Sequence, residues 1–192
     1  MRLEAEQKAQ QVVKRKKKAT RFGWLAGAAI IVLFFVWLAA RNNSPKADLA
    51  SGQERSATAA DLKKIAKKPV VTVPATVTEE LVIKDLVTGT GPVAQAGDNL
   101  TVKYVGVSKL TGQEFDSSWA RTPPTFDVAG IGKASVITGW NEGLLGMRVG
   151  SRRELIIPPA KGYGDQGSGT KIKPNDTLVF VIDLVKLARP AS

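Results

Sequence analysis

The sequence predicts a domain of the α+β class over residues 77–188, with five or six strands and one short helix. Two observations predict this class. From Val77 onward, short apolar or alternating runs are separated by glycine-rich turns, which is typical of strands. Only Thr138–Met147 carries apolar residues at the spacing of a helix. A stretch of about 110 residues is long enough to enclose one hydrophobic core.

Several segments of this domain carry the pattern of a strand. In Asn99–Val107 apolar and polar residues alternate, as in a strand with one buried face. Arg152–Ile157 likewise places Leu155 and Ile157 on one face. Thr177–Leu187 is apolar on both faces and is therefore expected at the centre of the sheet. The remaining strands are expected at Leu81–Val87, Glu114–Asp116 and Thr125–Val128.

The helical segment Thr138–Met147 is a poor helix by intrinsic propensity, because three of its ten residues are glycine. Its apolar residues Trp140, Leu144 and Met147 nevertheless lie on one face. We therefore expect packing against the rest of the domain, rather than propensity, to hold this helix.

Residues 22–40 contain no charged side chain and predict a transmembrane helix. As a helix these 19 residues would be about 29 Å long, close to the thickness of the hydrocarbon core. Trp24 and Trp37 lie near the two ends, where interfacial indole rings are favoured. A buried core helix is the competing interpretation, but the segment is apolar on every side and arginines flank it at both ends.

The basic residues around this segment predict its orientation. Residues 1–21 carry eight basic and two acidic side chains, so we expect them to form a cytoplasmic tail. The rest of the chain is then expected on the extracytoplasmic side of a cell membrane that it crosses once. A signal peptide cleaved after Ala39 or Ala40 is the alternative. The long apolar stretch and the long basic region before it favour an uncleaved signal-anchor.

Residues 41–76 are expected to be a flexible linker. They contain no aromatic residue and are rich in Ala, Ser, Lys and Pro, so they bury too little apolar surface to offset the entropy of ordering. A short helix around Ala59–Lys67 would be marginal by itself. The domain at 77–188 is followed by a short C-terminal tail, residues 189–192.

Composition excludes several classes of chemistry. The chain has no Cys and no His, which excludes disulfides, a thiolate zinc site, a Ser-His-Asp triad and a histidine base. No cofactor or metal is expected. The net charge of +11 resides mainly in the flanking segments, whereas residues 76–192 carry thirteen basic and twelve acidic side chains. This near-neutral domain disfavours nucleic acid as a partner.

Seven short motifs along residues 80–187 carry the strongest functional signal. They are VKYVG at 102–106, EFDSSW at 114–119, VITGWNEG at 136–143, GMRVG at 146–150, IPP at 157–159, YG at 163–164 and DTLVF at 176–180. In this order and with these gaps they resemble the FKBP family of peptidyl-prolyl cis-trans isomerases. The resemblance implies an antiparallel sheet wrapped around the short helix, with a substrate pocket between them.

The resemblance also implies which residues form the pocket. Matched by position, they are Tyr104, Phe115, Asp116, Val136, Ile137, Trp140, Tyr163, Ile172 and Phe180. In the family the ring at the Trp140 position forms the floor beneath the proline. The backbone N–H of Ile137 and the hydroxyl of Tyr163 are expected to hold substrate carbonyls. Asp116 is expected to orient polar groups beside Tyr104.

Three residues depart from the family pattern. Pro124 replaces an aromatic residue of the pocket rim, Lys171 stands where an apolar residue is usual, and Ser135 stands where an acidic residue can occur. All three positions belong to the rim. We therefore expect them to affect substrate preference and macrolide affinity more than activity.

The resemblance implies an enzyme that catalyses rotation about X–Pro bonds and needs no cofactor. Combined with the predicted membrane segment, it suggests that the enzyme assists the folding of exported proteins. The expected partners are proline-containing polypeptides, the membrane through residues 22–40, and macrolide inhibitors. The alternative is a tethered chaperone or binding module with the same fold and weak catalysis.

Overall fold

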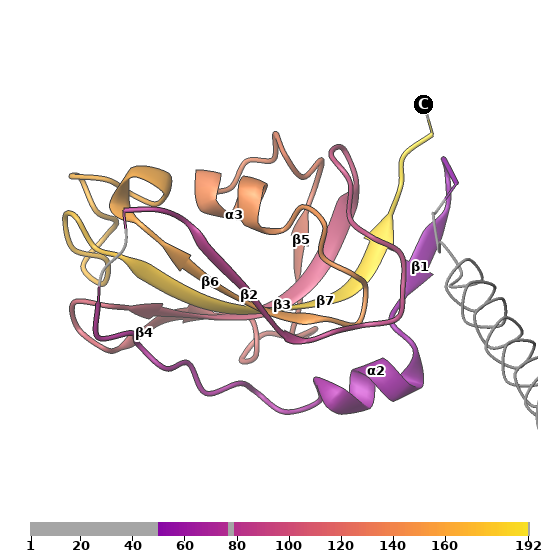
Figure 1. Cartoon of the computed structure of the whole chain (residues 1–192), viewed down its shortest axis with the longest axis horizontal. Coiled ribbons are helices and arrows are strands. Elements are labelled where there is room, and N and C mark those ends of the chain that lie inside the picture. Colours follow the sequence, from indigo (N-terminus) through magenta and orange to yellow (C-terminus); the bar gives the residue numbers. More distant parts are fainter. Residues whose placement is uncertain (1–49, 77–78, 192) are drawn as a thin grey trace, which may run out of the picture. The chain divides into compact units, whose positions relative to one another are not determined.

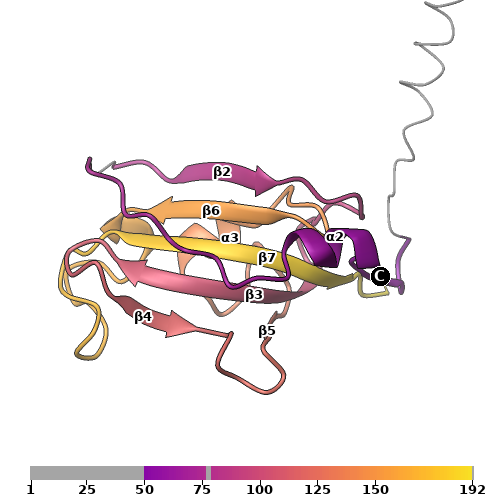
Figure 2. The same ribbon diagram turned by 90° about the horizontal axis from the view of Figure 1, so that it is seen from below.

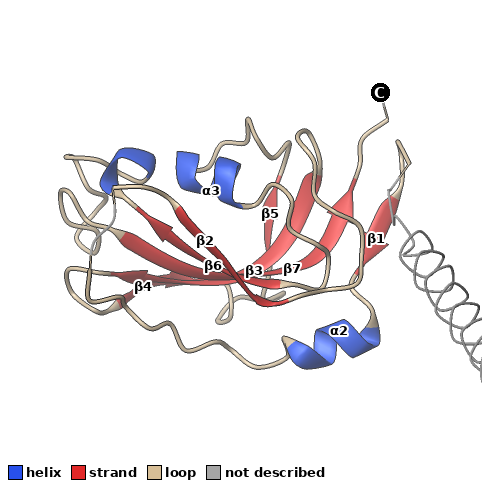
Figure 3. Cartoon of the chain, in the orientation of Figure 1, coloured by secondary structure: helices blue, strands red, loops and turns tan. Residues whose placement is uncertain are grey.

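The computed structural model describes residues 50–76 and 79–191, which form one antiparallel sheet with helices on both of its faces (Figures 1 and 3). The strands are β1 (Glu54–Ser56), β2 (Val82–Val87), β3 (Asn99–Ser108), β4 (Glu114–Ser117), β5 (Phe126–Val128), β6 (Arg152–Ile157) and β7 (Leu178–Ala188). The helices are α2 (Ala59–Lys64), α3 (Thr138–Gly143) and the 3₁₀ turn η1 (Pro159–Lys161).

The sheet is ordered β2-β6-β7-β3-β4, with β1 paired to β7 and β5 paired to β3. The six strands expected from the sequence are confirmed, and β7 lies in the middle of the sheet as its apolar faces predicted. The sheet wraps around α3, which confirms the arrangement that the family resemblance implied (Figure 1).

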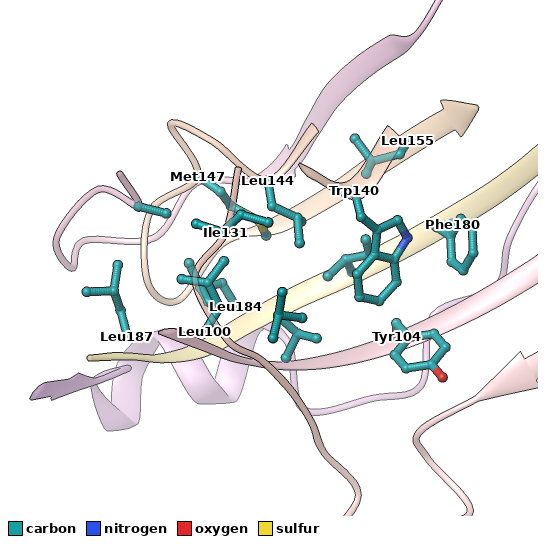
Figure 4. Packing of buried hydrophobic residues seen from close by; sticks show 14 of the residues in the cluster. Leu100, Tyr104, Ile131, Trp140, Leu144, Met147, Leu155, Phe180, Leu184 and Leu187 are labelled. Atoms are coloured by element: carbon teal, nitrogen blue, oxygen red, sulfur yellow. The ribbon is translucent and has the colours of Figure 1, made fainter. Parts of the chain in front are cut away.

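The main hydrophobic core lies between α3 and the sheet (Figure 4). Helix α3 ends at Gly143, earlier than the expected end at Met147, and Gly146 then takes a positive φ of 74°. Leu144 and Met147 are nevertheless completely buried in the core. The helical spacing of the apolar residues thus predicted the correct face but overestimated the length of the helix.

The glycines that make α3 a poor helix allow it to lie directly on β6. A Cβ atom at Gly139 would come within 2.5 Å of Ile157, and one at Gly143 within 2.7 Å of Leu155. The end of the helix is held by the buried Arg153, which donates hydrogen bonds to the carbonyls of Gly143 and Leu145 at 2.8 and 3.0 Å. Close packing and this arginine therefore compensate for low propensity.

The centre of the opposite face of the sheet, formed by β3 and β7, is also buried. Val105 pairs with Val181 and Val107 with Val179 in the β3–β7 register, and these four side chains are at most 6% exposed. Helix α2 and residues 65–76 run across this face, on the side away from α3 (Figures 1 and 2). We call residues 65–76 the N-terminal strap.

Three contacts fix the strap and the strand before it. Strand β1 pairs with the end of β7. Arg152, which is paired with the buried Asp183, donates hydrogen bonds to the carbonyls of Ile65 and Lys67 at 3.2 and 2.8 Å. Lys68 forms an ion pair with Glu114 at 2.8 Å.

Over residues 50–76 the structure therefore differs from the expected flexible linker and from the expected domain start at residue 77, whereas residues 41–49 of that linker lie outside the described residues. From residue 50 onward the described chain is part of the fold. The reason is that contacts with the sheet, rather than contacts within the segment, hold residues 50–76 in place. The composition of residues 41–76 considered alone does not reveal those contacts.

Asp61 fastens α2 to the rest of the domain. Its carboxylate is buried and accepts hydrogen bonds from the hydroxyl and N–H of Thr90 at 2.6 and 3.2 Å, from the hydroxyl of Thr58 at 3.0 Å, and from Lys64 at 3.1 Å. Chiefly through the Thr90 hydroxyl, and despite burial, these contacts lower the pKa of Asp61 from 3.8 to about 2.

Asp61→Asn is expected to lower the free energy of unfolding at neutral pH by about 2 kcal/mol. Because the pKa of Asp61 is lower in the folded state than in the unfolded state, this contribution is complete above about pH 4 and is lost as the pH falls towards 2. Urea unfolding of variant and wild type between neutral pH and pH 2 tests this. A difference between the two proteins that stays constant to pH 2 would contradict the assignment.

The expected transmembrane helix, residues 22–40, and the basic tail, residues 1–21, lie outside the described residues. Within residues 50–76 and 79–191, no helix has the length and apolar character needed to cross a bilayer.

Candidate functional site

A cavity of about 220 Å³ opens between α3 and the sheet. It is lined by Tyr104, Phe115, Asp116, Arg121, Phe126, Ser135, Val136, Ile137, Trp140, Tyr163 and Phe180. Eight of the nine residues expected from the sequence are in this set. Ile172 is the exception: it is 7% exposed and lines a neighbouring groove instead.

The interior of the cavity is a cluster of aromatic rings around Trp140 (Figure 4). The centre of the Trp140 ring lies 5.2 Å from that of Tyr104, 5.3 Å from Phe180 and 6.1 Å from Phe126. All three contacts are edge-to-face, a favoured geometry for aromatic rings. Phe115 packs edge-on against Phe180 at 5.4 Å. The interior of the cavity is thus formed by closely packed aromatic rings.

The register of the two central strands explains why these rings meet. Strand β3 presents Tyr104 towards the cavity, and its next inward position is Gly106, which pairs with Phe180 of β7. A Cβ atom at Gly106 would lie 2.7 Å from both the Phe115 and the Phe180 rings. The absence of a side chain at Gly106 therefore gives Phe115 and Phe180 room to approach each other.

One wall of the cavity is polar. The Tyr104 hydroxyl donates a hydrogen bond to Asp116, and Arg121 donates to the Tyr104 oxygen at 2.8 Å and to both Asp116 oxygens at 3.1 and 3.2 Å. The N–H of Ser117 donates to Asp116 at 2.8 Å. Arg121 also lies over the rings of Tyr104 and Phe126, at 5.4 and 5.7 Å from their centres.

This network fixes the protonation states of the wall. Burial raises the pKa of Tyr104, and its hydrogen bond to Asp116 raises it further. Burial also opposes ionisation of Asp116, but hydrogen bonds from Tyr104 and the Ser117 N–H, together with Arg121, lower its pKa below the ordinary value. Tyr104 therefore remains a neutral donor, and Asp116 remains an ionised acceptor.

Val136 and Ile137 reach the cavity because they form the entry to α3. Ile137 has extended backbone angles at the helix N-cap, and its carbonyl accepts hydrogen bonds from the N–H groups of Trp140 and Asn141. The Asn141 side chain holds the preceding loop through the backbone of Gly132, Ala134 and Val136, at 2.8–3.2 Å.

Arg121, Phe126 and Asn141 were not among the residues expected at the site. Phe126 is one of the aromatic residues of a predicted strand, a weak signal that fits the core equally well. Arg121 lies in the irregular segment between β4 and β5. Neither hydrophobic periodicity nor a sequence motif predicts that it contacts Tyr104 and Asp116. The Asn141 side chain binds backbone groups of the loop before α3, and the amino-acid sequence does not indicate such contacts.

The site can therefore bind an apolar ring by shape and direct a few hydrogen bonds to its neighbours. Among residues 50–76 and 79–191 there is no cluster of His, Cys, Asp or Glu that could hold a metal ion.

Comparison with known proteins gives concordant matches. Residues 91–185 match the family model of the FKBP-type peptidyl-prolyl cis-trans isomerases. An FK506-binding protein of Streptomyces anulatus is 56% identical over 108 residues, which cover 55% of this chain and 85% of that protein. A probable FK506-binding protein of Corynebacterium glutamicum is 48% identical over 108 residues, covering 56% and 86% of the two chains.

A solved structure is also similar. The 1.6 Å crystal structure of a peptidyl-prolyl cis-trans isomerase from Pseudomonas syringae pv. tomato matches with a TM-score of 0.51 and 30% identity. The match covers 68% of this chain and 90% of that one.

Proposed function

The chain belongs to the family of FKBP-type peptidyl-prolyl cis-trans isomerases. On this premise we propose that the cavity around Trp140 is the active site, in which X–Pro bonds of exported polypeptides are isomerised. The observation that carries the proposal is the convergence of Trp140, Tyr104, Phe115 and Phe180 on one cavity beside a single polar wall.

The chemistry requires no nucleophile and no metal. Rotation about an X–Pro bond is slow because the twisted amide loses its resonance, with a barrier of about 18–20 kcal/mol. The twisted amide is less charge-separated than the planar one, so an apolar cavity disfavours the ground state relative to the transition state. The aromatic rings hold the prolyl ring while the preceding carbonyl turns. A barrier lowered by about 5 kcal/mol would give an acceleration of several thousandfold.

The polar groups orient the peptide on either side of that bond. We expect the Ile137 N–H and the Tyr163 hydroxyl to donate to substrate carbonyls. The Tyr104–Asp116–Arg121 network keeps its own charges paired, so that it lines the cavity without competing for a proton. Macrolides related to FK506 are proposed to occupy the same cavity, because relatives of the chain carry that ligand in their names.

An isomerisation assay on the purified full-length chain tests the proposal directly. The assay follows a peptide in which cis-trans isomerisation of one X–Pro bond limits the observed rate. The chain should increase this rate, and FK506 should abolish the increase. If FK506 binds while the isomerisation rate stays at the uncatalysed value, the chain is a binding or chaperone module of the same fold.

Tyr163→Phe is expected to lower kcat/KM about 2- to 12-fold, which corresponds to one hydrogen bond of roughly 0.5–1.5 kcal/mol. The variant keeps the ring and removes only the hydroxyl, which lies at a partly exposed position of the cavity wall. The melting temperature should change little. Unchanged kinetics would remove Tyr163 from the substrate contacts.

The proposed setting is the extracytoplasmic face of a membrane. The support is the charge-free segment 22–40 with its basic excess in residues 1–21. A folding enzyme held there would meet polypeptides as they emerge from export, when their X–Pro bonds are still exposed.

Protease added to intact spheroplasts is expected to digest the folded domain, residues 50–191, and to leave a short membrane-retained fragment that contains residues 1–21. The fragment should resist carbonate extraction. Protection of the domain until lysis would reverse the orientation. Release of the whole chain by salt alone would overturn the membrane anchor.

A further inference from the structure

A groove of about 400 Å³ adjoins the cavity on the side of the loop after η1. We call it the rim groove; it is lined by Phe115, Asp116, Tyr163, Ser168, Gly169, Thr170, Lys171 and Ile172. It shares Phe115, Asp116 and Tyr163 with the cavity. If a proline occupies the cavity, as the proposed function requires, a residue next to that proline can therefore extend into the rim groove.

The groove presents a cation without an internal counter-charge. Lys171 is exposed, and none of the ion pairs found in residues 50–76 and 79–191 includes it. The one carboxylate among the lining residues, Asp116, is already engaged by Tyr104, Arg121 and the Ser117 N–H. The positive charge of Lys171 is thus left available to a ligand.

The amine is also held in place rather than free to move through solvent. Nζ of Lys171 donates a hydrogen bond to the carbonyl of Phe115 at 3.0 Å, which leaves two N–H groups for another acceptor. Two backbone hydrogen bonds between Ser168 and Ile172, at 2.9 and 3.2 Å, close the loop that carries Lys171. The hydroxyls of Ser168 and Thr170 line the same groove.

We infer that Lys171 determines substrate specificity by forming, with the rim groove, a subsite for the carboxylate side chain of a residue adjacent to the proline. The ammonium group supplies the charge, and the neighbouring hydroxyls supply further donors to a carboxylate oxygen. Because the site is open to solvent, the preference is moderate and falls with ionic strength.

The test compares Glu with its uncharged isostere Gln in peptides of two series, Ala-X-Pro-Phe and Ala-Ala-Pro-X. With the full-length chain at low salt, kcat/KM for Glu should exceed that for Gln about two- to fivefold in one series. Lys171→Met should bring this ratio close to one, and Lys171→Glu should bring it below one. Added salt at about 0.5 M should reduce the wild-type ratio.

Lys173→Met is the matched control, since Lys173 carries the same charge two residues further along the chain and does not line the groove. It should keep the wild-type ratio. Any of three results would overturn the subsite. The first is a Glu/Gln ratio of kcat/KM equal to one in both series. The others are a ratio that Lys171→Met leaves unchanged and a ratio that Lys173→Met lowers as much as Lys171→Met does. Absence of acceleration for the Gln peptides as well would instead overturn the isomerase mechanism proposed for the cavity.

Discussion

Trp140→Ala is expected to lower the free energy of unfolding by about 3–5 kcal/mol and to remove most of the isomerase activity. Trp140 is 4% exposed and its indole ring contacts Tyr104, Phe126 and Phe180, so truncation leaves a void in the aromatic cluster. The prolyl ring of a substrate would lose its floor at the same time. Loss of roughly 2 kcal/mol of apolar contact in the transition state corresponds to about 30-fold in kcat/KM.

Leu144→Ala separates the effect on folding from the effect on catalysis. Leu144 is completely buried and follows the same helix, but it does not line the cavity. Its truncation should cost about 2–5 kcal/mol of stability while leaving kcat/KM per folded molecule near that of the wild type. Urea unfolding and peptide kinetics below the melting temperatures of both variants measure the two quantities. A Trp140→Ala protein that is folded and fully active would show that the indole is not the floor of the active site.

A chain that begins at residue 77 is expected to be less stable than one that begins at residue 50 by roughly 3–6 kcal/mol, or about 10–25 °C in melting temperature. The shorter chain lacks β1, α2 and the strap. It therefore exposes the face of the sheet that the strap crosses in Figure 2, where β3 and β7 pair Val105 with Val181 and Val107 with Val179. The lost burial outweighs the entropy regained by the missing segment.

A matched pair of point variants tests the same interface in the full-length chain. Ile65 is 1% exposed at the start of the strap, whereas Val70 in the same segment is 91% exposed. Ile65→Ala should lower the free energy of unfolding by about 2–5 kcal/mol, and Val70→Ala should change it by less than about 0.5 kcal/mol. Equal stability of the two truncated chains, together with a neutral Ile65→Ala, would show that the strap lies on the sheet without stabilising it.

The sequence by itself determined the class of the domain, its strands and the aromatic interior of its site. Local apolar runs bounded by turn residues predicted β2 to β7, and in β3 and β6 buried residues alternate with less buried ones, as the sequence pattern indicated. The motifs around Tyr104, Asp116, Trp140 and Phe180 predicted residues that the structure brings to one cavity. These residues could be identified because the family constrains their identity and spacing together.

Only the tertiary structure decided the features that depend on surfaces distant in the sequence. Residues 50–76 looked like a linker because their own composition is poor in apolar residues. The surface that orders them belongs to β3 and β7, and the nearer of these strands begins 23 residues after the segment ends. Arg121 joins Tyr104 and Asp116 from an irregular loop, and Lys171 reaches the Phe115 carbonyl across 56 positions of sequence. A local sequence pattern indicates which side chains of a segment are buried and which are exposed. It does not indicate which distant surface or charged group the segment contacts, because those contacts depend on how the sheet folds.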